Sequence, residues 1–195
     1  MALMLIGNSH ITRYQRYLTT RYNDNVFQLS DSADVNTPII FHGISGGQVT
    51  NSAHVRSLGR AIAVHRPKCL IMQIGGNDLD RQGLNNEIVE EVIFKLCSLA
   101  KLWLEQYHLT NIVIAQLLPR FRTRHVPHPV YNDFVKQGNA LLKQELSSSG
   151  QIRYWRLKGL KQSQREVYCD GVHMNNVGFA KYHKNIRGAV IHCLS

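Results

Sequence analysis

The sequence lacks any long uninterrupted hydrophobic run. None of its stretches reaches the roughly 18 apolar residues that a membrane-spanning helix needs. The apolar start, residues 1–6, has no basic flank and is too short for a secretory signal, so we expect it to form a first strand. The sequence also has no internal repeat, low-complexity tract or evident linker, and 44% of its residues are hydrophobic. We therefore expect residues 1–195 to form a single domain with one core.

Cysteine is scarce, and its spacing argues against a metal site. Cys69, Cys97, Cys169 and Cys193 are far apart and include no CxxC pair. Zinc needs clustered ligands, and the ten histidines form no such cluster with the cysteines, so we expect no metal. Cys69 and Cys97 lie in apolar runs, which indicates buried free thiols. Free thiols without a secretory signal are typical of a reducing compartment, so we predict a cytoplasmic protein.

Acidic residues are few compared with basic ones. Lys and Arg number 23 against 13 Asp and Glu, and the formal net charge is +10. Such a charge attracts polyanions such as RNA or an anionic membrane, although a basic surface that only keeps the protein soluble is an equally good interpretation. Arg120, Arg122 and Arg124 cluster after a predicted strand, and we consider them candidate anion-binding residues, with a solvated loop as the alternative.

Apolar, β-rich runs alternate with segments of helical period along the whole chain. The most apolar run, residues 69–74, is typical of a strand buried on both faces of a parallel sheet. This alternation predicts right-handed βαβ units in a three-layer α/β/α sandwich. We expect strands at about 3–6, 39–41, 69–74, 111–117 and 152–157, and helices at about 12–21, 52–64, 88–103, 132–146 and 175–194.

Four short motifs follow predicted strands or precede the last helix. Functional groups gather at the carboxyl ends of the strands in open parallel sheets. Each motif is ordinary by itself, since Ser9 could simply cap the first helix and the others are typical turn sequences. Their joint occurrence in this order is what indicates a site. The motifs are Gly7-Asn8-Ser9-His10, Gly43-Ile44-Ser45-Gly46-Gly47, Gly75-Gly76-Asn77-Asp78 and Asp170-Gly171-Val172-His173.

This combination suits nucleophilic attack on an ester. A serine hydroxyl becomes a good nucleophile when a histidine takes its proton, and that histidine needs a carboxylate to fix its tautomer. Ser9, His173 and Asp170 supply these three groups, and a tight turn brings Asp170 within reach of His173. The oxyanion of the tetrahedral intermediate needs preorganised donors. The backbone amides of Ser9 and Gly46 and the side-chain amide of Asn77 are candidates.

These motifs together resemble those of the SGNH (GDSL-like) hydrolases, a superfamily named for its Ser, Gly, Asn and His. The resemblance implies a flavodoxin-like, five-stranded parallel sheet. It also implies hydrolysis of acetyl or lipid acyl esters without metal or cofactor. Two positions depart from the family pattern, because Asn8 stands where Asp is usual and Gly47 stands where many members carry Asp. The corresponding residues are Ser9, Gly46, Asn77 and His173, with Asp170 completing the D-x-x-H block.

A narrower resemblance lies in the second half of the chain. Residues 154–160, 170–181 and 186–190 are similar to the esterase domain in the first open reading frame protein of some vertebrate non-LTR retrotransposons. That resemblance implies a cytoplasmic ribonucleoprotein, self-association as a homodimer and contact with lipid membranes. Two other functions remain open: an RNA- or membrane-binding module with little activity, and an acyltransferase that shares the acyl-enzyme step. The presence of all three triad residues favours an active enzyme over the inactive module.

Overall fold

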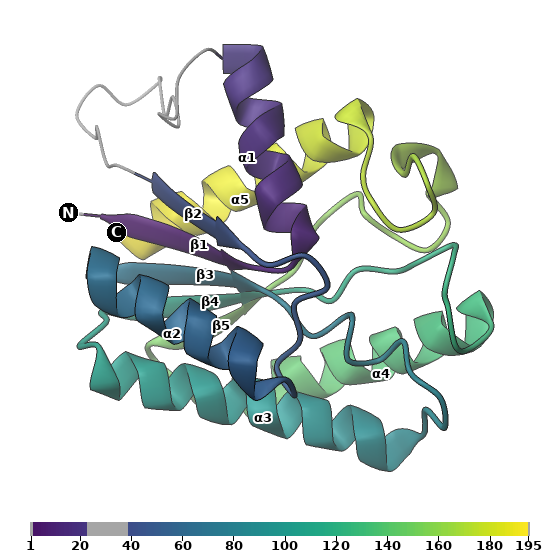
Figure 1. Ribbon diagram of the computed structural model, residues 1–195, viewed down its shortest axis with the longest axis horizontal. Coiled ribbons are helices and arrows are strands. Elements are labelled where there is room, and N and C mark those ends of the chain that lie inside the picture. The colour runs from purple at the N-terminus through teal and green to yellow at the C-terminus, as the bar shows by residue number, and fades with distance from the viewer. Residues whose placement is uncertain (1, 23–38, 195) are drawn as a thin grey trace.

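The structure is a computed structural model that describes residues 2–22 and 39–194 (Figure 1). Its centre is a five-stranded sheet in which every pair of neighbours is parallel, in the order β2-β1-β3-β4-β5. The strands are β1 (Leu3–Gly7), β2 (Ile39–Gly43), β3 (Cys69–Gln73), β4 (Asn111–Ala115) and β5 (Ile152–Trp155). The helices are α1 (Ser9–Tyr22), α2 (Ser52–His65), α3 (Asn86–Gln106), α4 (His128–Glu145) and α5 (Asn176–Leu194), with a short 3₁₀ helix, η1 (Arg165–Val167), before α5.

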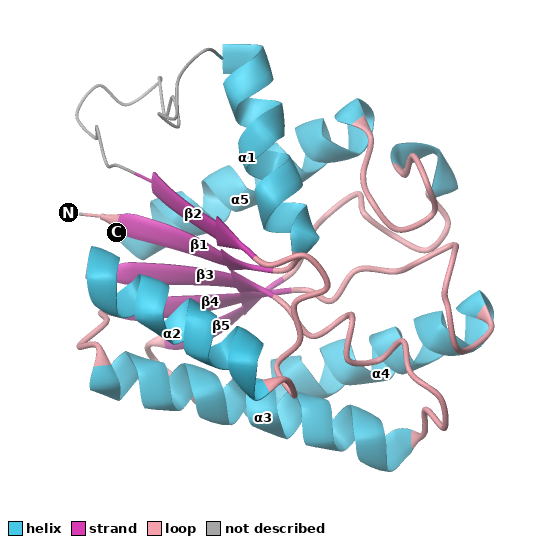
Figure 2. Cartoon of the chain, in the orientation of Figure 1, coloured by secondary structure: helices cyan, strands magenta, loops and turns pink. Residues whose placement is uncertain are grey.

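Helices cover both faces of the sheet, which confirms the predicted α/β/α sandwich (Figure 2). Alternate residues of β1 point to opposite faces, as the period of two in a strand requires. Leu3 and Leu5 pack in the core beneath α1 and α5, whereas Met4 and Ile6 pack in the core against α2, α3 and α4. All four side chains are fully buried. The buried, uniformly apolar strand is therefore a consequence of helices on both sides.

The order of the strands places a topological switch point next to β1. The chain passes from β1 to β2 on one side and then crosses to β3 on the other, so the loops after β1 and β3 diverge at the carboxyl edge. Such a switch point is where open α/β sheets bind ligands. Gly7 closes this end of β1, because a Cβ there would lie 2.1 Å from the Gln73 carbonyl oxygen. The two ends of the chain lie at the opposite edge of the sheet (Figure 1).

The predicted elements are all found, with their ends displaced by a few residues. The largest displacement is at α4, which begins at His128 rather than near residue 132. Pro129 falls in its first turn, where a missing N–H removes no hydrogen bond of the helix. Cys69 and Cys97 are buried free thiols, as predicted. Within the described ranges, no helix is long and apolar enough to cross a membrane.

Candidate active site

The candidate nucleophile, Ser9, is the first residue of α1 and follows β1 directly. The preceding residue, Asn8, is buried, and its side-chain oxygen accepts a hydrogen bond of 3.0 Å from the amide of His10. The Asn8 carbonyl also accepts a hydrogen bond of 3.0 Å from the amide of Ile11. Asn8 therefore accepts hydrogen bonds from amides in the first turn of α1, so the Ser9 hydroxyl is not needed to cap the helix. This explains why asparagine serves at a position where the SGNH pattern usually has aspartate.

The structure brings the three predicted triad residues into one chain of hydrogen bonds. Ser9 Oγ lies 3.0 Å from His173 Nε2, and His173 Nδ1 lies 2.6 Å from Asp170 Oδ2. The other oxygen, Asp170 Oδ1, accepts hydrogen bonds from the amides of Val172 at 2.9 Å and His173 at 2.7 Å. The carboxylate is thus fixed by its own turn and faces the imidazole ring.

The charge state of Asp170 decides the tautomer of His173. Partial burial raises the pKa of Asp170, but the hydrogen bonds from His173 and Val172 outweigh burial and hold this pKa well below its usual range. The carboxylate is therefore ionised and can only accept a hydrogen bond. The Nδ1 atom of His173 must donate to it. In the neutral ring, Nε2 is then unprotonated and accepts a hydrogen bond from the Ser9 hydroxyl.

Hydrogen bonds from two directions hold the turn that carries Asp170 and His173. The amide of Cys169 donates to the His173 carbonyl at 2.8 Å, which closes the turn before α5. The carbonyl of Gly171 accepts a hydrogen bond of 2.7 Å from the amide of Phe121 in the loop after β4. A Cβ at Gly171 would lie 2.9 Å from Arg122 Cβ, and its φ of +82° also favours glycine. A hydrogen bond within the turn and another from the loop after β4 therefore hold Asp170 and His173 in place.

The three candidate oxyanion donors lie on neighbouring loops at the same edge of the sheet. Within the described part of the chain, no residue accepts a hydrogen bond from the amides of Ser9 or Gly46. Gly46 is exposed with a φ of +69°, and apart from its chain neighbours no described residue has a heavy atom within 4 Å of the position that a Cβ would occupy. The Asn77 side chain uses one N–H in a hydrogen bond of 2.9 Å to the Gly47 carbonyl. Its second N–H remains for a ligand.

Asp78, which the sequence interpretation did not assign a role, joins the loops that carry these donors. It is buried, and its carboxylate accepts hydrogen bonds from the amides of Val49 at 3.2 Å and Thr50 at 2.9 Å, and from the Thr50 hydroxyl at 2.7 Å. Burial raises the pKa of Asp78, although these hydrogen bonds partly offset the effect. The sequence did offer one signal for this residue, because Asp78 directly follows the candidate Asn77. Its donors, almost 30 residues away, were not evident from the sequence.

Comparison with solved structures identifies the fold that carries this geometry. No family profile and no curated protein matches the chain. Solved structures do match: a candidate acylhydrolase from Bacteroides fragilis has a TM-score of 0.74 at 15% identity and covers 100% of this chain and 88% of its own. A GDSL-like lipase from Bacteroides thetaiotaomicron has a TM-score of 0.74 at 15% identity, with 98% and 88% covered. A catalytic mutant of an acetylxylan esterase from Geobacillus stearothermophilus has a TM-score of 0.64 at 15% identity, with 95% and 91% covered.

The chain has the SGNH-hydrolase fold. The matched structures support this superfamily fold, and their descriptions give no support to the narrower resemblance to a retrotransposon protein. Within the described residues, no group of three or more His, Cys, Asp and Glu side chains is placed to hold a metal ion.

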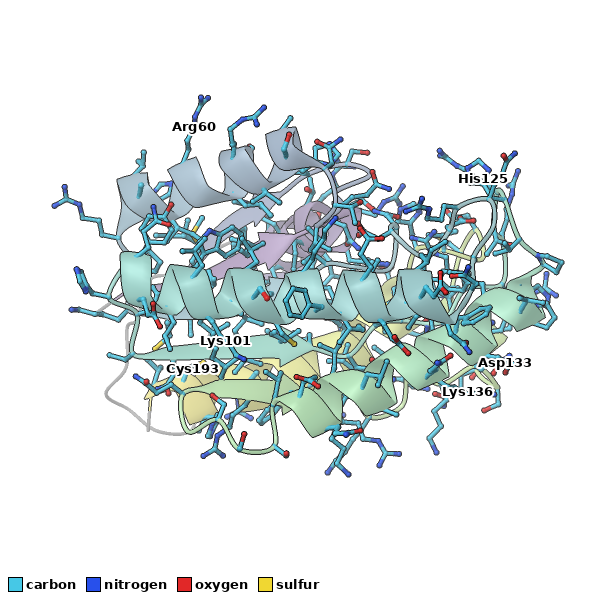
Figure 3. The ribbon with its side chains drawn as sticks, turned by 90° about the horizontal axis from the view of Figure 1, so that it is seen from below. Arg60, Lys101, His125, Asp133, Lys136 and Cys193 are labelled. Carbon is cyan, nitrogen blue, oxygen red and sulfur yellow. The ribbon has the colours of Figure 1, made fainter. Side chains whose placement is uncertain are left out.

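The three candidate anion-binding arginines of this SGNH fold do not share one environment. Arg122 and Arg124 are exposed in the loop after β4, at the end of the molecule where Figure 3 shows His125. Arg120 is only 7% exposed and forms an ion pair of 2.9 Å with Asp80. The prediction that Arg120 binds an external anion is therefore wrong, because its charge is buried and already paired. A cluster of arginines in the sequence did not reveal which side chain turns inward.

His10, directly after the candidate nucleophile, was also missed. Its ring is buried, its centroid lies 5.6 Å from that of His173, and its Nδ1 has no hydrogen-bond partner among the described residues. Burial, followed by the nearby charges of His173 and Arg120, lowers the pKa of His10 to about 3. His10 is therefore a neutral ring packed beside His173.

Proposed function

We propose that this chain is a serine esterase that hydrolyses carboxylic esters through an acyl-enzyme intermediate. The observation that carries the proposal is the continuous chain of hydrogen bonds from Ser9 through His173 to Asp170. The backbone amides of Ser9 and Gly46 lie on neighbouring loops and have no acceptor among the described residues. The SGNH fold and its acylhydrolase, lipase and esterase neighbours support the same reaction class. The site residues are thus a catalytic triad and an oxyanion hole in this proposal.

The geometry gives each group one step. His173 Nε2 takes the proton as Ser9 Oγ bonds to the ester carbonyl carbon, and Asp170 stabilises the imidazolium that forms. The carbonyl electron pair moves to oxygen, where the amides of Ser9 and Gly46 and the free N–H of Asn77 meet the negative charge. Collapse breaks the bond to the alcohol, which leaves with the proton from His173. Water then attacks the acyl-Ser9 ester, with His173 again as the base, and releases the acid.

Covalent labelling tests the nucleophile. A fluorophosphonate should label the wild-type protein at Ser9, and Ser9→Ala should abolish both labelling and ester turnover, with a loss of several orders of magnitude. Ser52→Ala is a matched control, because Ser52 also begins a helix directly after a capping asparagine, Asn51. This control should label and turn over like the wild type. Equal labelling of wild type and Ser9→Ala would point to another serine and reject the assignment.

The proposal extends to the length of the acyl group in the substrate and to the molecule that accepts this group. The named neighbours include a lipase and an acetylxylan esterase, so we include acetyl and longer acyl esters as substrates. A panel of esters of increasing acyl length would separate these two classes. An acyltransferase would form the same acyl-enzyme and pass the acyl group to an alcohol instead of water. Comparing free acid with transferred product, in the presence of an added alcohol, distinguishes the two.

The basic residues near the triad favour an anionic partner as a second element of the proposal. Arg122 and Arg124 are exposed on the loop that braces the triad turn. Arg13, Arg16 and Arg21 of α1 line a groove of about 420 Å³ that also contains Met174, the neighbour of His173. Anionic lipid headgroups suit such a rim, because acyl esters and negative charge occur together at a membrane surface. RNA would compete for the same residues.

The predicted ribonucleoprotein role, homodimer and cytoplasmic location stay predictions. They follow from the resemblance to a retrotransposon esterase domain rather than from the geometry of the site. Size-exclusion chromatography with light scattering would test the homodimer directly.

A further inference from the structure

Arg120 carries a buried charge within reach of the proposed oxyanion hole. One arm of its guanidinium donates to Asp80 Oδ2 at 2.9 Å, and the other donates to Asn77 Oδ1. The guanidinium carbon lies 5.2 Å from the centre of the Tyr131 ring, which adds a cation–π contact. A buried charge is costly unless it is paired and hydrogen-bonded, and Arg120 meets both conditions.

Other hydrogen bonds hold Arg120 and its partner in place. The Asn132 side chain of α4 accepts from the Arg120 amide at 2.8 Å and donates to the Arg120 carbonyl at 2.7 Å. The Asp80 carboxylate also accepts hydrogen bonds from the amides of Arg124 at 3.0 Å and His125 at 3.2 Å. Arg120 therefore occupies a single position, set by α4 on one side and by the loop after β3 on the other.

The contacts of Asn77 permit only one orientation of its amide. Arginine can only donate hydrogen bonds, so the Asn77 atom that faces Arg120 must be the oxygen. The Gly47 carbonyl can only accept, so the atom that faces it must be the nitrogen. A flipped amide would place two donors together at Arg120 and two acceptors together at Gly47. The flip would thus lose both hydrogen bonds and add two repulsive contacts.

We propose that Arg120 is a positioning residue for ester hydrolysis: it locks the Asn77 amide so that the free N–H is presented to the oxyanion. This inference rests on the proposed esterase function and deepens it. The charge on Arg120 also polarises the amide, because withdrawing electron density through Oδ1 makes Nδ2–H a better donor. Arg120 touches no reacting atom in this scheme and acts only through Asn77.

Substituting Arg120 tests the proposal through turnover. Arg120→Met keeps an unbranched side chain but removes every donor, and we expect kcat to fall by about 10- to 100-fold with little change in KM, since preorganised donors act in the transition state. Arg120→Lys keeps the positive charge on a single ammonium nitrogen, which cannot reach both partners as the two arms of arginine do, and should recover part of the loss. Arg81→Met is the matched control, because this arginine is exposed and directly follows Asp80 in the chain.

Loss of the ion pair can also destabilise the fold, because Arg120→Met leaves Asp80 buried without its charge partner. The double variant Arg120→Met with Asp80→Asn removes both charges and should restore most of the thermal stability. Its kcat should remain as low as that of Arg120→Met. Recovery of kcat together with stability would show that Arg120 has a purely structural role and would overturn the proposal.

A double-mutant cycle with Asn77→Ala gives the deciding measurement. If Arg120 acts through Asn77, then Arg120→Met should lower kcat by less than about threefold in the Asn77→Ala background, because coupled residues are not additive. A full additional loss in that background would reject the inference. Failure of the esterase proposal has a different signature: the wild type itself would neither label at Ser9 nor turn over esters.

Discussion

The side chain of Asn8 takes over the capping of α1 and so leaves the hydroxyl of Ser9 available for another hydrogen bond. Because its side-chain oxygen accepts the amide hydrogen of His10, the Ser9 hydroxyl is available to His173 at 3.0 Å. The positive end of the α1 dipole then lies next to the nucleophile, where it favours the negative charge that develops during attack. Asn51 caps α2 in the same way ahead of Ser52, but there the local sequence supplies no triad. The difference between the two serines therefore lies in what the rest of the fold brings to them.

The two proton-handling residues should differ in the size of their effects. His173→Ala should abolish ester turnover near neutral pH, because Ser9 would have no base. Asp170→Asn should leave the fold intact and lower kcat by on the order of a thousandfold or more, because the imidazolium loses its counter-charge and the tautomer is no longer fixed. Steady-state kinetics with circular dichroism as the folding check would measure both. Near-normal turnover in Asp170→Asn would mean that another carboxylate orients His173.

His10 should make the stability of the protein sensitive to acid. Its pKa is about 3 in the folded state and 6.5 in its ordinary environment, so between these values the unfolded chain binds a proton that the folded chain excludes. The free energy of unfolding therefore falls as pH decreases through this window, and this contribution is constant above it. Between pH 7 and pH 4 the loss amounts to at most about 3 kcal/mol. Urea unfolding at both pH values should show a smaller pH dependence for His10→Gln than for the wild type. An unchanged pH dependence would mean that His10 is not the group responsible.

At the scale of elements, periodicity was sufficient to predict the fold, and short motifs at the strand ends indicated which side chains would lie together. Residues 69–74 predicted a buried strand because helices on both faces require uninterrupted apolar residues. The proximity of Ser9, His173 and Asp170 could be predicted because Ser9 follows a strand and Asp170 and His173 share one turn. The contacts of Arg120 could not, because Asp80 and Asn77 lie 40 or more residues away and pair with it only once α4 has fixed the loop. Local patterns encode local geometry, whereas a buried ion pair depends on how loops are packed.

The loop after β2 and the loop after β3 should act as one unit through Asp78. Asp78→Ala removes three hydrogen bonds from Val49 and Thr50, so Gly46 and Asn77 lose their fixed relation. We expect kcat to fall by about tenfold or more, with a smaller change in KM, because the oxyanion donors are no longer preorganised. Asp133→Ala is a matched control, since it removes an exposed carboxylate on α4 whose ion pair among the described residues is with Lys136.

The Asp78 experiment also has an outcome that would contradict this role. If Asp78→Ala lowered the thermal midpoint but left kcat unchanged, the carboxylate would hold the fold without positioning the donors. Measuring kcat well below the midpoint of each variant separates the two effects.

Over the whole molecule, the basic groups are not arranged uniformly with respect to the site. The loops that carry the triad and the oxyanion donors gather at one end, away from the two chain ends (Figure 1). Arg122 and Arg124 are exposed at this end, near His125, whereas Lys101 of α3 lies toward the opposite end (Figure 3). Because Arg120 is internally paired, it does not add to the external field in the way that the other two arginines do.

If the site end faces anionic membranes, its exposed arginines should govern vesicle binding. Each basic residue near a charged surface contributes about 1 kcal/mol, so Arg122→Ala with Arg124→Ala should weaken binding to anionic vesicles by roughly 30-fold at low salt. Arg60→Ala with Lys101→Ala is the matched control: it has the same net charge, but Arg60 extends from α2 and Lys101 lies toward the far end (Figure 3). Co-sedimentation with anionic and neutral vesicles, at low and high salt, measures the effect, and screening should reduce it at high salt. Equal weakening by both pairs would show a response to net charge alone. Displacement from vesicles by RNA would show instead that the arginines form a general polyanion surface.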